Sequence, residues 1–344
     1  MIRFNNDYNR SCHPAILKAL EDDFENSYPG YMTDERCQRA REEIKKYLGC
    51  PSAEIHFATG GTQANAMVIA SALRPYESVV CAETGHINVH ETGAVEHTGH
   101  KIEALPGARD KISAGALDTY VGKARSSEIT EHITQPGMVY ISFPTEFGSI
   151  YSLAELKELR EVCDRYGMYL FVDGARLAYG LASPKCDVSL ADLCSLSDVF
   201  YIGGTKCGAM FGEAIVIRND SLKKGFRNMI KQSGAMLAKG WILGIQFEPL
   251  FRDGLYFEIG KKAVDYALRI KKAFNDKGID SYIDSSTNQQ FVTVTKKQAE
   301  ILAKDFIYEN EDELEDGRKV IRFCTSWATT EEDADALIKA VEAL

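Results

Sequence analysis

The pattern of apolar and polar residues predicts strands that alternate with helices through most of the chain. Short, continuously apolar runs are typical of strands buried on both faces, and helices show apolar residues every three to four positions. The strands are expected at 54–59, 78–82, 137–143, 169–173, 198–202 and 213–217, and the main helices at 15–24, 34–48, 63–73, 91–97 and 153–166. This order predicts an α/β fold with a mainly parallel central sheet and helices on both faces.

The pattern changes towards the end of the chain. Residues 233–275 are helical in pattern, with a break near Asp253-Gly254. Segments 290–294 and 319–324 then alternate as half-buried strands do. The last helix begins at a capping box, Thr330-Glu331-Glu332-Asp333.

Two domains follow from this change. We expect an N-terminal arm and a large domain over residues 1–249, and a small α+β domain over residues 250–344. The acidic run at 309–316 is expected to be a solvated loop between the last two strands.

Composition excludes several classes of partner. The formal net charge of −10 disfavours nucleic acid and anionic membranes. No apolar run approaches the roughly 20 residues needed to span a bilayer. Nine scattered cysteines without a CxxC pair indicate reduced thiols in a cytoplasmic protein. Four histidines between 86 and 100 lack the ligand spacing typical of a metal site.

Polar side chains follow the ends of successive predicted strands. They are Thr62, His86, Glu146, Asp173 and Lys206. In an open α/β sheet the carboxyl ends of parallel strands meet at one edge, where ligands bind. We therefore expect these five side chains to converge.

The turn Gly60-Gly61-Thr62 joins a strand to a helix. The free N–H groups and positive dipole of a helix N-terminus attract anions, so this turn is a candidate phosphate cradle. A plain glycine turn with a threonine cap is the alternative, and the GxxxxGK[ST] motif is absent.

Lys206 lies where a strand ends and a glycine-rich turn begins. Partial loss of water lowers the pKa of such an amine and suits it to Schiff-base chemistry, although an exposed turn lysine is the alternative. Asp173 and Arg176 are either a local ion pair or ligands. A phosphate cradle, a lysine and a buried carboxylate together are what pyridoxal 5'-phosphate requires.

These residues carry a family resemblance. Gly60-Gly61-Thr62-Gln63-Ala64-Asn65, the His86 loop, Asp173-Gly174-Ala175-Arg176, Thr205-Lys206 and Ile321-Arg322 occur in the order of the threonine aldolase / aromatic β-eliminating lyase family. The chain resembles low-specificity L-threonine aldolases over nearly its full length. The resemblance implies an aspartate-aminotransferase-like fold (fold type I) and a pyridoxal-phosphate-dependent lyase that cleaves L-threonine or L-allo-threonine to glycine and acetaldehyde.

The resemblance also implies roles for single residues. Lys206 would form the Schiff base, Asp173 would pair with the pyridine nitrogen, and His86 would stack on the ring and act as a base. Arg176 would bind the phenolic oxygen or the substrate carboxylate, and Arg322 that carboxylate. The cofactor ligands would be Gly60, Gly61, Thr62, His86, Asp173, Arg176, Thr205 and Lys206.

Two positions depart from the family pattern. Glu146 stands where many bacterial relatives have a histidine, and Asn6 where relatives have a serine near the substrate carboxylate. These departures leave open the preference between threonine and allo-threonine and the preferred side chain at Cβ. A β-eliminating lyase and a phenylserine-type aldolase stay open as alternatives, as does a non-catalytic phosphate-binding protein. The resemblance further implies a homodimer or homotetramer with shared active sites.

Overall fold

The computed structural model describes residues 1–344 and confirms the predicted α/β sheet. Seven strands follow the order β2-β8-β7-β6-β5-β3-β4. Their bounds are β2 Glu54–Ala58, β3 Glu77–Cys81, β4 Lys101–Ala104, β5 Gln135–Ser142, β6 Tyr169–Asp173, β7 Val199–Gly203 and β8 Glu213–Ile217. Only β8 is reversed, since it is antiparallel to both β2 and β7. The beginning of β8 therefore lies at the carboxyl ends of its neighbours.

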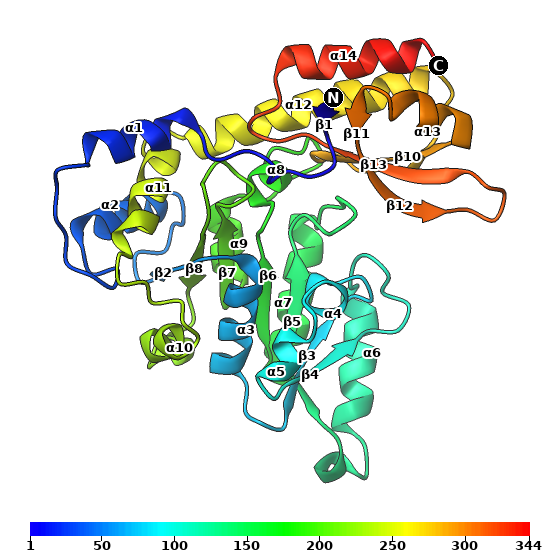
Figure 1. Cartoon of the computed structure of the whole chain (residues 1–344). Coiled ribbons are helices and arrows are strands. Elements are labelled where there is room, and N and C mark those ends of the chain that lie inside the picture. The colour runs from blue at the N-terminus through cyan, green and yellow to red at the C-terminus, as the bar shows by residue number, and fades with distance from the viewer.

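Helices surround this sheet (Figure 1). They are α1 Pro14–Asp22, α2 Glu35–Lys45, α3 Gly61–Ala72, α4 His86–Val89, α5 Ala94–His97, α6 Ala114–Arg125, α7 Leu153–Tyr166, α8 Leu177–Leu181, α9 Leu190–Leu196, α10 Phe226–Gln232 and α11 Trp241–Arg252. Every residue of β7 and β8 is buried, as expected for strands covered on both faces. α7 shows how the sequence sets its ends: a Ser152–Glu155 capping box starts it, and Gly167 ends it with φ +64°.

A second sheet lies near the C-terminus, in the antiparallel order β12-β13-β10-β9. Its elements are β9 Ser281–Ile283, β10 Gln289–Val294, α13 Lys296–Leu302, β11 Phe306–Ile307, β12 Glu309–Glu313, β13 Lys319–Cys324 and α14 Glu331–Glu342. The long helix α12 (Leu255–Asp276) runs from α11 to this region (Figure 1). Its residues up to Val264 join the large hydrophobic core, and those from Ile270 join a second one. The boundary at residue 250 stays a prediction.

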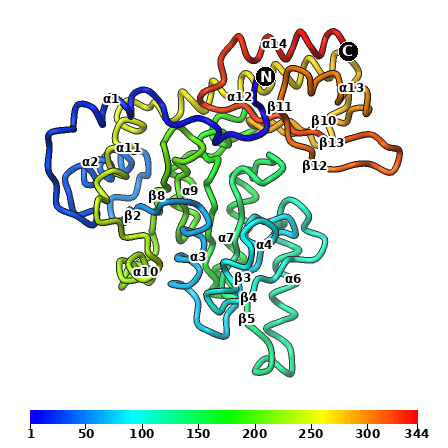
Figure 2. The backbone as a smooth tube through the Cα atoms, in the orientation of Figure 1, coloured from blue at the N-terminus to red at the C-terminus, as the bar shows by residue number.

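The N-terminal segment bonds to the C-terminal region and to the end of the large sheet. Its first strand, β1 (Ile2–Arg3), pairs with β11, and the Phe4 carbonyl accepts a hydrogen bond from the Cys324 amide. The segment then runs back towards α1 (Figure 2), and the His13 amide bonds to the Gly208 carbonyl. Residues 4–13 are thereby held across the end of the sheet where the predicted site lies.

Three predicted elements are wrong. The acidic run at 309–316 contains a strand, β12, because its backbone pairs with β13 while all five side chains stay exposed at the sheet edge. The helix expected at 91–97 is interrupted, since Gly93 has a φ of +75° and only α5 follows it. Residues 233–240 precede α11 and are not helical.

Two classes of feature are missing from the structure. None of its helices has both the length and the apolar character needed to cross a bilayer. No three side chains among the histidines, cysteines and acids are placed to hold a metal ion, the histidines between 86 and 100 included.

Candidate active site

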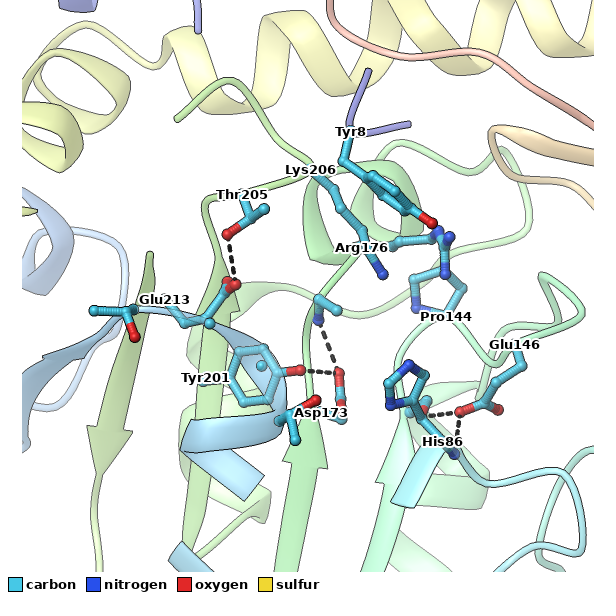
Figure 3. A pocket seen from close by; sticks show the side chains of 16 residues that line it. Tyr8, His86, Pro144, Glu146, Asp173, Arg176, Tyr201, Thr205, Lys206 and Glu213 are labelled. Carbon is cyan, nitrogen blue, oxygen red and sulfur yellow. Dashed lines mark hydrogen bonds between the residues drawn. The ribbon is translucent and has the colours of Figure 1, made fainter. Parts of the chain in front are cut away.

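A cavity of about 340 Å³ opens at the carboxyl ends of the parallel strands. All five side chains that were expected to converge line it: Thr62, His86, Glu146, Asp173 and Lys206. Four further predicted residues also line it: Gly60, Gly61, Arg176 and Thr205. Figure 3 shows Lys206 entering from above, with Asp173 below and His86 at the side. The convergence predicted from the strand ends is confirmed.

The N-terminus of α3 forms one wall of the cavity. The first intrahelical bond runs from the Ala64 amide to the Gly60 carbonyl, so the amides of residues 61–63 have no helical partner. No side chain caps this end of the helix. A Cβ on Gly61 would lie 2.9 Å from the Tyr201 hydroxyl, so a side chain there would displace the hydroxyl that donates to Asp173. The result is a wall of unpaired N–H donors, which suits an anion.

Asp173 is 4% exposed and lies at the end of β6. Its carboxylate accepts hydrogen bonds from the hydroxyls of Tyr140 and Tyr201 and from the Ala175 amide, the last at 2.9 Å. Burial alone raises the pKa of Asp173, but the charge of His86 and these hydrogen bonds outweigh it and lower the pKa below its ordinary value. The carboxylate is therefore held ionised inside the protein.

Lys206 follows β7 on a turn that packs tightly against the end of β6. A Cβ on Gly174 would lie 2.0 Å from the Tyr201 carbonyl, and one on Gly203 would lie 2.4 Å from the Ala175 carbonyl. The Tyr179 hydroxyl donates to the Lys206 carbonyl at 2.6 Å and fixes the backbone. Loss of water, followed by the nearby charge of Arg176, lowers the pKa of the Lys206 amine. The exposed-turn alternative is thereby excluded.

His86 begins α4 and is oriented by a buried acid that the sequence did not single out. Its Nδ1 lies 2.8 Å from Oε1 of Glu91, which also accepts from the Asn65 amide at 2.8 Å. Asn65 donates to Asp173 as well, at 3.1 Å. With the Nδ1 proton donated to Glu91, Nε2 is the nitrogen that is free to accept a proton.

Glu146 contacts the backbone of the His86 loop. Its Oε1 accepts from the His86 amide at 2.9 Å and from the Ser142 hydroxyl at 2.7 Å. Burial raises the pKa of this carboxyl. Glu146 therefore holds the backbone that carries His86, in addition to lining the cavity.

Arg176 forms a bidentate ion pair across 169 positions of sequence. Its Nε lies 2.7 Å from Oδ2 of Asp7 and its Nη2 lies 3.1 Å from Oδ1. Asp7 is 1% exposed and also accepts from the Asn288 amide. Burial raises the pKa of Asp7, but the charges of Arg176 and Lys206 outweigh it and lower this pKa to about 2. The local Asp173–Arg176 pair considered from the sequence does not form.

Two predicted residues lie outside the cavity lining. Arg322 forms an ion pair with Glu311 at 3.0 Å and donates to the Asn5 carbonyl. The side chain of Asn6 accepts from the Tyr8 amide at 3.1 Å. Tyr8 itself lines the cavity and is 57% exposed at its mouth (Figure 3).

Reasoning from sequence missed several residues at the site, among them Asp7, Tyr8, Glu91, Tyr201 and Glu213. Asp7 and Tyr8 enter from the N-terminal arm, and no local signal places that arm at the sheet. Tyr201 and Glu213 did carry a signal, because each is a polar group within an apolar strand at the edge where the other site residues gather.

Comparisons with known proteins identify the family of the chain. A family model described as beta-eliminating lyase matches residues 19–319. A low specificity L-threonine aldolase from a Pseudomonas species is 28% identical over 301 residues, which cover 87% of this chain and 85% of that protein.

Solved structures extend the comparison. A threonine aldolase from Leishmania major is 41% identical with a TM-score of 0.96, over 100% of this chain and 99% of that one. A mutant aspartate aminotransferase from Thermus thermophilus is 12% identical with a TM-score of 0.71, over 100% of this chain and 91% of that one. This last likeness concerns the fold alone and confirms the predicted fold type.

Proposed function

Because the chain belongs to the beta-eliminating lyase family, we propose that it is a pyridoxal-phosphate-dependent threonine aldolase. Its reaction would be retro-aldol cleavage of the Cα–Cβ bond of L-threonine or L-allo-threonine, giving glycine and acetaldehyde. The observation that carries this proposal is the arrangement of Lys206, Asp173 and the α3 N-terminus around one cavity. The names of the Pseudomonas and Leishmania relatives support the choice of substrate.

The residues present fit pyridoxal 5'-phosphate. The unpaired amides of residues 61–63 and the Thr62 hydroxyl suit its phosphate. The ionised Asp173 suits a protonated pyridine nitrogen, and the Lys206 amine of lowered pKa suits its aldehyde. Thr205, Arg176 and His86 complete the proposed set of ligands. When bound, the cofactor supplies an electron sink for the electron pair released at Cα.

The substrate carboxylate needs a cation, and the structure offers two. Arg176 lines the cavity and binds Asp7 through Nε and Nη2, which leaves Nη1 without a bond to Asp7. Arg322 forms an ion pair with Glu311, so it binds the substrate carboxylate only if that ion pair opens. We propose Arg176 as the first carboxylate ligand, with Arg322, Asn6 and Glu146 as further contacts that tune the preferred side chain.

His86 is the proposed base for the substrate β-hydroxyl. Glu91 holds Nδ1, and Nε2 is left to accept the proton directly or through a water. Replacing His86 with alanine is expected to lower kcat/KM for threonine by about 10²- to 10⁴-fold, the usual contribution of a general base. His132→Ala is the matched control, since His132 is exposed and lies outside this cavity. Near-normal turnover by the His86 variant would remove the assignment.

The activity is tested by incubating the purified protein and cofactor with threonine, allo-threonine and phenylserine. Glycine formed from the first two supports the proposal, and glycine formed only from phenylserine would indicate the phenylserine-type aldolase. Release of ammonia without glycine, from aromatic or sulfur amino acids, would indicate β-elimination instead. A colourless protein that is not labelled at Lys206 by borohydride would indicate a non-catalytic phosphate-binding protein.

We further propose a homodimer or homotetramer in the cytoplasm. All nine cysteines are free thiols, which suits a reducing compartment. A second cavity adjoins the α3 N-terminus and opens towards α10, and Val89, Tyr31 and Met210 are apolar yet exposed. We expect light scattering to give two or four times the 38.2 kDa chain mass, whereas a monomer at micromolar concentration would contradict shared sites.

A further inference from the structure

Glu213 is a buried acid at the proposed phosphate site whose function the aldolase reaction does not explain. It is 3% exposed and lines the same cavity as Gly61, Thr62 and Lys206. A carboxylate beside a phosphate dianion is repelled by it, and burial strengthens that repulsion. Any role for Glu213 must therefore explain how its carboxyl group and a phosphate group can occupy the same cavity.

The reversed strand β8 places Glu213 between the turn of the proposed phosphate cradle and the turn that carries Lys206. Glu213 pairs with Ala58, just before the Gly60-Gly61 turn, and with Gly203, just before the Lys206 turn. Since β8 alone is antiparallel, it is the only strand of the sheet whose first residue, rather than its last, faces the site. Figure 3 shows the Glu213 carboxyl pointing up towards Thr205.

The hydrogen bond between Glu213 and Thr205 can form with either side chain as the donor. Its Oε2 accepts from the Gly204 amide at 2.9 Å, and its Oε1 lies 2.8 Å from the Thr205 hydroxyl. That hydroxyl already accepts from the Gly212 amide at 3.0 Å. An ionised Glu213 uses the Thr205 proton. A protonated Glu213 donates its own proton to Thr205 and frees the hydroxyl proton for another acceptor.

We propose that Glu213 carries a proton whenever the phosphate group is bound, and that this proton lets Thr205 donate to the phosphate. Phosphate binding is then coupled to proton uptake by the protein. Glu213 is a positioning residue in this scheme, acting through Thr205 and by the removal of its own charge. The inference rests on the proposed cofactor and adds to it a pH dependence of cofactor retention.

The surroundings of Glu213 favour the neutral form. Burial raises the pKa of Glu213 to about 7, although the hydrogen bonds from Thr205 and Gly204 and the charge of Lys206 oppose it. The other ionisable groups that face it are Asp173, Tyr201, Cys207 and Tyr256, and Lys206 is the only cation among them all. The neighbouring strand β2 ends in Ala58, which does not ionise. A bound phosphate raises the pKa of Glu213 further.

The test compares wild type with Glu213→Gln, which mimics the protonated acid at nearly the same size. We expect the dissociation constant of pyridoxal 5'-phosphate, measured on the full chain freed of cofactor, to rise more steeply with pH in wild type. Between pH 6 and pH 8 the ratio of the two constants should rise about tenfold, because each pH unit above a pKa near 7 lowers the protonated fraction tenfold. Titration of the phosphate itself is common to both proteins and cancels in the ratio. A ratio that does not change with pH overturns the inference.

A second measurement uses wild type alone, in case the variant does not fold. An infrared difference spectrum between phosphate-bound and phosphate-free protein at pH 8, with inorganic phosphate as the probe, should show a gain of protonated carboxyl. Absence of that band in phosphate-saturated protein overturns the inference. Failure of both the cofactor and inorganic phosphate to bind either protein would instead refute the proposed cofactor site.

Discussion

Replacing Lys206 with alanine is expected to lower kcat for threonine cleavage by at least about 10³-fold, even with saturating cofactor. The amine is the only one in the cavity, and the loss of water that lowers its pKa keeps more of it in the nucleophilic neutral form. The measurement is glycine formation by the variant and by wild type, with borohydride trapping as a second readout. Wild type should gain cofactor mass on the peptide that contains Lys206, and the variant should not.

Lys224 provides the matched control for that experiment, because it is exposed and lies away from the cavity. Lys224→Ala should keep wild-type turnover and trapping. Recovery of part of the Lys206→Ala activity by added methylamine would show that the missing group is an amine. Retention of more than a tenth of wild-type turnover by Lys206→Ala would contradict a covalent role for this lysine.

Asp173→Asn is expected to lower kcat by about 10²- to 10³-fold, the scale of losing one preorganised electrostatic group. Asparagine has no charge to oppose a protonated ring nitrogen. Its NH₂ group would also face a hydroxyl donor from Tyr140 or Tyr201, so one buried hydrogen bond is lost. Kinetics should be paired with the visible spectrum of the bound cofactor, which should shift as the ring loses its proton.

Tyr140→Phe separates the charge from the hydrogen bonds, since it removes one donor and keeps the carboxylate. Its effect should be well below that of Asp173→Asn. Because the pKa of Asp173 lies below its ordinary value of 3.8, the wild-type carboxylate stays ionised down to about that pH, and its protonation affects activity only below it. A kcat for Asp173→Asn within threefold of wild type would show that the ring charge does not matter here.

The sequence is sufficient to predict those site residues that lie at the ends of buried strands. The hydrophobic runs locate β5, β6, β7 and β8, and the polar residue after each parallel strand must then lie at the same edge of the sheet. Lys206 and Asp173 follow from this rule alone. Their roles came from the order of motifs along the chain.

Contacts between distant segments could not be predicted in the same way. Asp7 pairs with Arg176 only because β1 joins β11 and carries the N-terminal arm over the sheet. Arg322 is paired with Glu311 because an acidic segment forms an edge strand that its composition disfavours. Glu91 follows His86 by five residues, and their contact depends on α4 ending at Val89, which the sequence pattern does not predict.

The reversed strand β8 also limits where the chain tolerates insertions. The turn between Lys206 and Glu213 is closed by two left-handed glycines, Gly208 and Gly212, and β8 then pairs on both sides. One extra residue absorbed as a register shift would exchange the two faces of β8 and turn Glu213 away from the cavity. Peptide tags and loop grafts are therefore better accommodated at the exposed hairpin that joins β12 to β13, where Gly317 turns at the surface.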